Sequence, residues 1–414
     1  MNDRHRKASR PRVPLYFPIH EYETRWDRVS SEMARLGFDT ALVWSRSAGG
    51  HEKFADVFYL THYYSNQSGQ ADEDSWLGIG FAAVILEVGQ TPELIADLPT
   101  FPEEQVATDR IARSDEPDRV RLVADSIRAR GLDDRRIALV GDGFLPWRYA
   151  RTLQQQLPGV EWVPADELVE SVRRLKSPRE LDCIREGGVI VTAALTKQLE
   201  AAVRGGTQAE IAAAGAHELL RRGGTFHMIP VASGLGRDLA PFTNEPLTAF
   251  DVRIQVRPGD LVRTWIYGPA WQGYWLDPGR TVVAGGHSTA EQRRWISAAN
   301  EVVTTLIEEI RPDRSVREIA ELGARLRRET GTADDATTET FPLLGHGIGL
   351  FWERPTIWLD VDDNEPHWAF WEGQTMGVET FLSHPDVGTV GVEQNIIVHS
   401  SGNELLTPVP LEWW

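Results

Sequence analysis

Four side chains in the C-terminal half of the chain could together bind a metal ion. They are Asp277, His346, Glu379 and Glu393, and each stands in a segment that is otherwise apolar or rich in small residues. A buried carboxylate without a compensating partner is costly, so a cation or an arginine is expected beside each acid. Three carboxylates and one imidazole suit Fe, Mn, Zn or Co. Taken singly, each residue has another explanation: a turn, a satisfied core histidine or an ion pair.

The sequence around these four residues predicts that strands position them. Their contexts are Gly-Tyr-Trp-Leu-Asp-Pro-Gly-Arg-Thr, Gly-His-Gly-Ile-Gly-Leu, Gly-Gln-Thr-Met-Gly-Val-Glu-Thr-Phe and Val-Gly-Val-Glu-Gln-Asn-Ile-Ile-Val. Ligands held on rigid elements keep the fixed geometry that a metal site needs. We therefore expect a site built on a sheet.

The first part of the chain alternates helical and strand-like segments. The expected helices are 21–36, 119–130 and 149–157, and the expected strands are 40–44, 81–86 and 136–140. This alternation predicts a layered α/β domain that runs to about residue 175.

A second region opens at Ser177. Its side chain can cap a helix whose first turn contains Pro178 and the favourable negative charge of Glu180. Further helical patterns predict helices over 178–203, 208–222, 289–310 and 316–330, with strands between and after them. We therefore divide the chain into residues 1–175 and 176–414.

Composition excludes several classes of protein. The 414 residues include 43 Lys plus Arg against 61 Asp plus Glu, and the net charge of −18 argues against a nucleic-acid or anionic-membrane partner. Cys183 is the single cysteine, so no intramolecular disulfide forms. The longest apolar run, 77–86, is shorter than the roughly 20 residues of a membrane helix and suits a buried strand. No secretory signal follows the basic residues 1–12, so we expect a cytoplasmic protein.

The order and contexts of the four candidate ligands resemble the family of prolidase, aminopeptidase P, methionine aminopeptidase and creatinase, metallopeptidase family M24. Further similarities are the segments Leu-Lys-Ser-Pro-Arg-Glu-Leu from 175, Pro-Gly-Asp-Leu-Val from 258 and Gly-His-Gly-Ile-Gly-Leu from 345. Asp277 matches the family's second aspartate, His346 its histidine, Glu379 its first glutamate and Glu393 its last. The resemblance implies a creatinase-like N-terminal α/β domain followed by a pita-bread α+β domain, and a homodimer.

One departure from the family concerns the metal. In the two-metal members an aspartate follows the Asp-Leu-Val lead, but Trp265 takes that place here, and no Asp or Glu occurs from 261 to 276. Tryptophan cannot ligate a metal. The resemblance implies that the missing aspartate serves only one of the two metals. We therefore predict one divalent transition metal (Fe, Mn, Zn or Co) bound by the four candidate ligands.

Other departures concern the substrate. The resemblance predicts a histidine near position 242, where this chain has Phe242, and a second histidine where it has Trp352. The arginine often found two places before the last glutamate is Gly391. These changes argue against ordinary prolidase or aminopeptidase chemistry. Creatinase activity is not expected either, because creatinases depend on a histidine near position 242 and on a glutamate at the position of Asp277.

We predict a metal-dependent hydrolase that cleaves a C–N bond in a small amide or dipeptide-like substrate. Glu379 and His346 are the predicted catalytic residues, and His227 and Tyr274 could replace the missing acid–base groups. Two alternatives stay open: a metal-dependent lyase that acts on a small carboxylate or zwitterion, and a catalytically inactive binding protein. Product analysis separates hydrolysis from elimination.

Overall fold

The chain folds into two compact units, Met1–Arg173 and Arg174–Trp414. The computed structural model describes residues 15–45, 55–64, 82–98, 101–113, 119–236, 239, 249–330, 341–360 and 367–413. Phe242 and the first part of the apolar run, residues 77–81, lie outside the described residues.

The described residues of the N-terminal unit form a six-stranded sheet with helices packed on it. The strand order is β4-β3-β2-β1-β5-β6, in which β1 is antiparallel to β2 and parallel to β5. The strands are β1 Thr40–Trp44, β2 Ala83–Glu87, β3 Glu93–Ile95, β4 Ile111–Ala112, β5 Arg136–Val140 and β6 Glu161–Pro164. The helices are α1 Ile19–Arg35, α2 Ala55–Thr61, α3 Arg119–Ala129, α4 Trp147–Gln156 and α5 Glu167–Arg173. The predicted α/β domain is confirmed.

The C-terminal unit is built on a sheet that, in the described residues, has eight strands. Its order is β15-β14-β16-β17-β13-β10-β8, with β18 paired to β17. The strands are β8 Val231–Gly234, β10 Leu261–Trp265, β13 Gly279–Val283, β14 Leu343–Ile348, β15 Trp352–Trp358, β16 Thr375–His384, β17 Gly388–Ile397 and β18 Glu404–Leu405. Two short pairs accompany it, β11 Gly268–Trp271 with β12 Tyr274–Leu276 and β7 Gly206–Thr207 with β9 Gln255–Val256.

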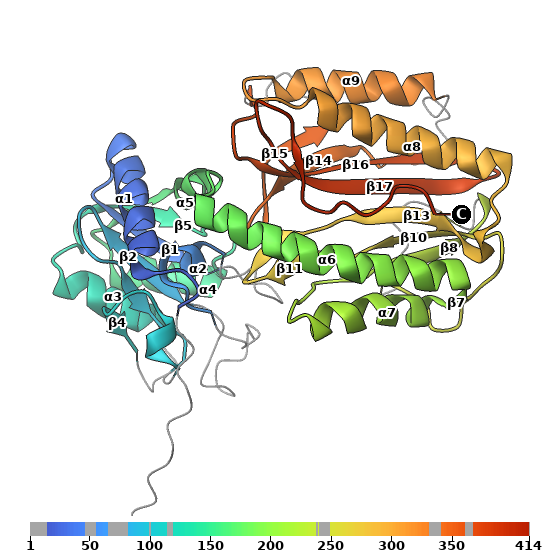
Figure 1. Cartoon of the computed structure of the whole chain (residues 1–414). Coiled ribbons are helices and arrows are strands. Elements are labelled where there is room, and N and C mark those ends of the chain that lie inside the picture. The colour runs from blue at the N-terminus through green and yellow to red at the C-terminus, as the bar shows by residue number, and fades with distance from the viewer. Residues whose placement is uncertain are drawn as a thin grey trace, which may run out of the picture. The chain divides into compact units, whose positions relative to one another are not determined.

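Two helix pairs accompany this sheet. In Figure 1, α8 Ala290–Glu309 and α9 Val316–Glu329 run above the strands, and α6 Pro178–Arg204 and α7 Gln208–Arg221 run below them in this view. Each of the four helices begins with a capping box. The predicted cap at Ser177 is confirmed, and Glu180 completes its capping box. The predicted pita-bread domain is confirmed by this mixed architecture together with the structural similarity reported below.

The core of the C-terminal unit lies between α8 and the long strands β16 and β17. Trp295, Val302 and Leu306 of α8 are buried in one cluster with Val378 and Val392. Since β16 and β17 are paired over their whole length, this packing makes their backbones a rigid base for side chains.

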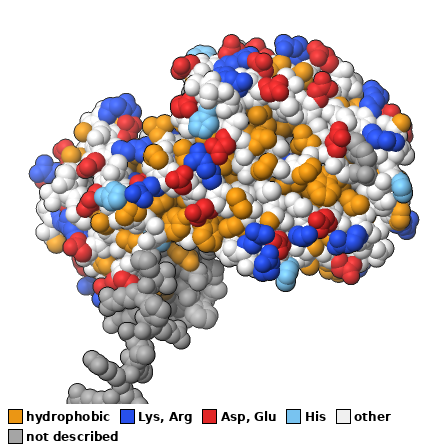
Figure 2. Space-filling model, in the orientation of Figure 1, with side chains coloured by type: hydrophobic (Ala, Val, Ile, Leu, Met, Phe, Trp, Pro, Cys, Tyr) orange, Lys and Arg blue, Asp and Glu red, His pale blue; other side chains and the backbone are white. Residues whose placement is uncertain are grey.

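The surface of the described residues carries charges of both signs. Figure 2 shows acidic and basic side chains interspersed over the visible face, with hydrophobic side chains gathered over the middle of the C-terminal unit. None of the described helices has the length and apolar character needed to span a membrane.

Candidate metal centre

Two rows of directly paired residues cross the sheet and carry the site. In the first row Trp265 of β10 is opposite Gly279 of β13, which is opposite Glu393 of β17, which in turn is opposite Glu379 of β16. Directly opposed residues of antiparallel strands project their side chains on the same face of the sheet. The four positions therefore share a face.

The second row lies two residues further along the same face. His346 of β14 is opposite Gly377 of β16, and Gly377 is opposite Asn395 of β17. Asp277, just before β13, donates its backbone N–H to Asn395 Oδ1 over 3.0 Å. A Cβ at position 377 would lie 2.4 Å from Glu393 Oε1, so glycine leaves the space in which the acidic side chains meet.

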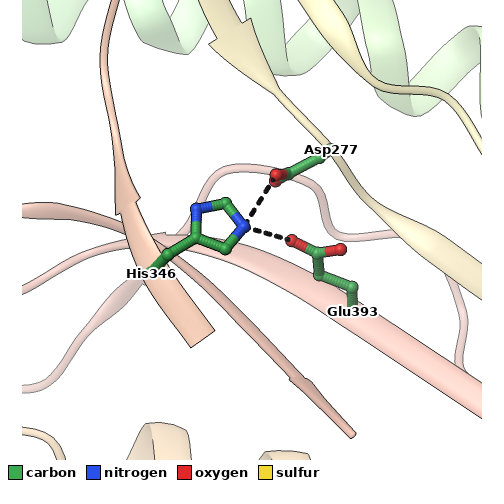
Figure 3. Close-up of side chains that lie close together, drawn as sticks. All are labelled: Asp277, His346 and Glu393. Carbon is green, nitrogen blue, oxygen red and sulfur yellow. Dashed lines mark ion pairs between the residues drawn. The ribbon is translucent and has the colours of Figure 1, made fainter. Parts of the chain in front are cut away.

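Three of the predicted ligands converge in the buried interior. The ligand atoms of Asp277, His346 and Glu393 all lie within 4.8 Å of one another, and Figure 3 shows the three side chains pointing toward a common point. His346 Nε2 is 3.1 Å from Asp277 Oδ2 and 3.9 Å from Glu393 Oε1. His346 Nδ1 lies 3.1 Å from the carbonyl oxygen of Gly347, which can only accept a hydrogen bond. That contact places a proton on Nδ1 and directs Nε2 toward the carboxylates.

Glu379, the fourth predicted ligand, stands slightly apart. Its Oε1 lies 4.0 Å from His346 Nε2, and its side chain is buried on the same face of the sheet. It does not belong to the group of three whose ligand atoms all lie within 4.8 Å of one another. Glu379 therefore lies at the edge of the group of three.

The hydrogen bonds of the described residues leave two buried carboxylate oxygens without a partner. They are Asp277 Oδ2 and Glu393 Oε1, the two oxygens that face His346 Nε2. A buried polar atom without a hydrogen bond is expensive, and two anionic ones side by side are more so. These residues fit a divalent cation, which would ligate both oxygens and the imidazole nitrogen.

The pKa values of the clustered side chains are shifted because several carboxylates are buried close together. Burial and the neighbouring carboxylates of Asp277 and Glu379 raise the pKa of Glu393 well above its ordinary value. Burial likewise raises the pKa of Glu379 to about 8. Burial lowers the pKa of His346, but the adjacent Asp277 outweighs it and brings the value to about 9. The pKa values of both glutamates and of the imidazole are therefore shifted toward their protonated forms.

Two residues that the sequence did not single out as partners hold the outer oxygens of this cluster. Trp265 Nε1 donates to Glu393 Oε2 over 2.7 Å, and Asn395 Nδ2 donates to Asp277 Oδ1 over 2.7 Å. Sequence reasoning treated Trp265 only as a missing ligand. Asn395 was readable in principle, because it follows Glu393 by two residues and must share its face of the strand.

The two predicted acid–base residues have different surroundings in the structure. The Tyr274 hydroxyl donates to Glu180 Oε1 over 2.6 Å and is buried against α6. His227 is exposed, and its ring centre is 5.7 Å from that of Trp275, two residues before Asp277. Of the two, His227 has the accessibility that an acid–base group needs.

Aromatic rings border the centre. The Trp352 ring is 46% exposed, and its centre lies 4.6 Å from that of the His346 ring. Phe351 packs edge-on against Trp275, with ring centres 5.3 Å apart. The position where the resemblance predicted a second histidine thus presents an exposed apolar ring beside a candidate ligand.

The two units also match known families in sequence. Residues 182–400 match metallopeptidase family M24, and residues 25–175 match the creatinase/prolidase N-terminal domain. The chain belongs to metallopeptidase family M24. The predicted family is thereby confirmed, and with it the order of an N-terminal creatinase-like domain and a C-terminal M24 domain.

Relatives within this family include peptidases. A Xaa-Pro dipeptidase of Pyrococcus horikoshii is 25% identical over 66% of this chain and 73% of its own length. An uncharacterized hydrolase/peptidase of Sinorhizobium fredii is 26% identical over 96% of this chain and 98% of its own. The structure of a Xaa-Pro dipeptidase from Bacillus anthracis superposes with a TM-score of 0.76 at 21% identity, covering 95% of this chain and 99% of that one. These relatives do not bear on the predicted homodimer or cytoplasmic location, which stay predictions.

Proposed function

We propose that this M24 protein is a hydrolase that binds one divalent transition metal ion and cleaves a C–N bond in a small amide or dipeptide-like substrate. The observation that carries the proposal is the convergence of two buried carboxylate oxygens, Asp277 Oδ2 and Glu393 Oε1, on His346 Nε2, with no conventional hydrogen bond to either oxygen within the described residues. Family membership supports a metal-dependent peptidase-like reaction.

The proposed ligands are Asp277, His346 and Glu393, with Glu379 completing the set. When bound there, a divalent metal supplies Lewis acidity, which polarises a carbonyl group and lowers the pKa of water. Asp277 and Glu393 hold their free oxygens toward a common point. His346 donates a hydrogen bond from Nδ1–H to the Gly347 carbonyl oxygen, so Nε2 is the ring nitrogen that a cation would displace a proton from and ligate. Fe, Mn, Zn and Co all suit this donor set.

Proton transfer is assigned to Glu379. Its Oε1 lies 4.0 Å from His346 Nε2, outside the tight group of three, so the carboxylate can both approach the centre and receive a proton from an attacking water. His227 is the proposed second acid–base group, because its exposed ring adjoins Trp275. Tyr274 is not used, since its hydroxyl already donates a hydrogen bond to Glu180.

The substrate is proposed to differ from that of an ordinary Xaa-Pro peptidase. The exposed Trp352 ring beside His346 offers an apolar face where the family resemblance predicted an imidazole. Removing an imidazole removes a proton donor, whereas an aromatic face favours an apolar or cationic group of the substrate. We therefore expect small amides and acylated amino acids to be better substrates than Xaa-Pro dipeptides.

The test joins metal content to product chemistry. Purified protein is stripped, reconstituted separately with Fe²⁺, Mn²⁺, Zn²⁺ and Co²⁺, and measured for metal per chain by inductively coupled plasma mass spectrometry. It is then assayed on Xaa-Pro dipeptides, other dipeptides and N-acyl amino acids in ¹⁸O-labelled water. We expect about one metal per chain and one ¹⁸O atom per cleaved bond. His346→Ala loses both metal and activity, and the exposed His217→Ala on α7 retains both.

Other results would change the assignment. A metal-containing protein that releases an alkene without ¹⁸O is a lyase, the first alternative that the sequence left open. A protein that takes up none of the four metals contradicts the proposal and favours the binding-protein alternative.

A further inference from the structure

Two neutral donors flank the acidic pair in the metal centre. Trp265 Nε1 holds Glu393 Oε2, and Asn395 Nδ2 holds Asp277 Oδ1, each over 2.7 Å. Each carboxylate therefore has one oxygen committed to a neutral N–H group and one oxygen, Glu393 Oε1 or Asp277 Oδ2, without a hydrogen bond. Both free oxygens face the same imidazole nitrogen.

We propose that Trp265 is a positioning residue that, together with Asn395, makes Glu393 and Asp277 one-oxygen ligands and limits the centre to a single cation. The inference rests on the proposed metal-dependent function and extends it to a residue that cannot itself bind a metal. A carboxylate with both oxygens free can chelate one cation or bridge two. The indole N–H removes that freedom from Glu393.

The indole reaches Glu393 only because Gly279 lies between them. Trp265 and Glu393 are on strands two apart, which corresponds to roughly 9–10 Å of sheet. A Cβ on Gly279, the residue opposite to both, would lie 1.8 Å from Cε2 of the indole. The ring thus lies flat across the glycine. Any other residue at 279 would displace it and break its hydrogen bond to Glu393.

Phe381 and Gly391 also hold the ring in place. Phe381 stacks on it with ring centres 5.2 Å apart and an interplanar angle of 18°. A Cβ at Gly391, the neighbour of Phe381 across β16 and β17, would lie 2.8 Å from Cη2 of the indole. Two glycines and one stacked ring therefore enclose Trp265 in one orientation. Its N–H is aimed at Glu393 before any cation binds.

A role in packing alone makes a different prediction from a role in positioning. Trp265→Phe keeps an aromatic ring against Phe381 and removes the N–H group. If the ring only fills space, this change leaves metal binding unaffected. If the N–H positions Glu393, the carboxylate is free to rotate and metal affinity falls by about 10–100-fold, the usual effect of losing a hydrogen bond to a metal ligand.

The matched control is Trp295→Phe. Trp295 is equally buried, at 3% exposure, and its Nε1 donates to Glu291 Oε1 over 3.1 Å within α8 rather than to a proposed ligand. Co²⁺ is titrated into metal-free protein against a competing chelator, and its visible spectrum reports the number of coordinating atoms. We expect a weakened Co²⁺ affinity and an altered spectrum for Trp265→Phe, and no change for Trp295→Phe. A Co²⁺ affinity within twofold of the unmodified protein would overturn the positioning role.

A second variant tests the limit of one cation. Trp265→Asp replaces the neutral donor by a carboxylate in the space facing Glu393 Oε2, and we expect a second equivalent of Co²⁺. A folded Trp265→Asp protein that still binds one equivalent of Co²⁺ would refute the claim that Trp265 sets the limit of one cation. If the variant does not fold, the Trp265→Phe titration decides whether Trp265 positions Glu393. Failure of the unmodified chain to bind Co²⁺ refutes the proposed function itself. If the unmodified chain binds one Co²⁺ ion and the Trp265 variants bind it equally well, only the positioning role is refuted.

Discussion

Glu393→Gln should have opposite effects on stability in the presence and in the absence of metal. Glutamine has the shape of glutamate, and its amide oxygen can still accept the Trp265 N–H. Its NH₂ group would replace the oxygen that faces His346 and cannot ligate a cation. The substitution therefore removes a metal ligand and a buried carboxyl group at once.

The two effects can be sized separately. A metal ion present at 100 times its Kd stabilises the folded state by about 2.7 kcal/mol, or about 5–11 °C in Tm for a domain of this size. Glu393→Gln should lose that increment. In the metal-free protein, burial raises the pKa of Glu393 well above its ordinary value of 4.5, so folding at neutral pH requires proton uptake. Removing this requirement should stabilise the metal-free variant at neutral pH.

Differential scanning calorimetry at pH 7 with chelator or with excess metal measures both effects. The expected order of Tm for the C-terminal unit is metal-bound unmodified protein first, the variant second under either condition, and metal-free unmodified protein last. Glu301→Gln, an exposed change on α8, serves as the control and should follow the unmodified protein. A variant that keeps the metal-dependent rise in Tm would show that Glu393 is not a ligand. A metal-free variant less stable than its parent would refute the argument from charge crowding.

Three further outcomes are expected. Gly377→Ala should lower metal affinity by about tenfold or more, because its Cβ would lie 2.4 Å from Glu393 Oε1; equilibrium dialysis measures it, and unchanged affinity would contradict the geometry. Trp352→Ala should raise KM by about tenfold with unchanged metal content, because the exposed ring borders His346; an unchanged KM would exclude substrate contact. Burial lowers the pKa of His62, so the folded protein is most stable above about pH 6.5, where the imidazole is neutral, and loses stability as the pH falls and the unfolded chain takes up a proton there. The urea midpoints of unfolding at pH 7 and pH 5 should therefore differ less in His62→Asn than in the unmodified protein. Asparagine is chosen because it tolerates the φ of 60° at this position.

Local sequence patterns predicted many of the helices and some of the strands. The expected helix over 178–203 is observed as α6 Pro178–Arg204, and the expected strand over 40–44 is β1. Helix caps and hydrophobic periodicity act within a few residues, so they can be read along the chain. The short elements α2 and α5 were not predicted, because seven residues are too few for a clear helical period.

The candidate ligands were also readable from sequence, because each is a carboxylate or imidazole in an otherwise apolar segment and their order and contexts resemble family M24. Asp277, His346 and Glu393 are brought together as expected, and Glu379 stands at 4.0 Å from the imidazole. The roles of the residues around them were not readable. Nothing local distinguishes Tyr274, whose hydroxyl binds Glu180 94 residues away, from a tyrosine that faces the site.

The sequence by itself determined which atoms could bind a cation and that position 265 could not contribute one. Only the tertiary structure decided that Trp265 lies across Gly279 to donate to Glu393, 128 residues further along the chain. The physical reason is that cross-strand register brings together residues of distant segments, and no local pattern encodes which glycine will lie beneath which ring. The types of side chain that can bind a metal can therefore be read from the sequence, whereas the hydrogen bonds that orient those side chains depend on how the sheet packs.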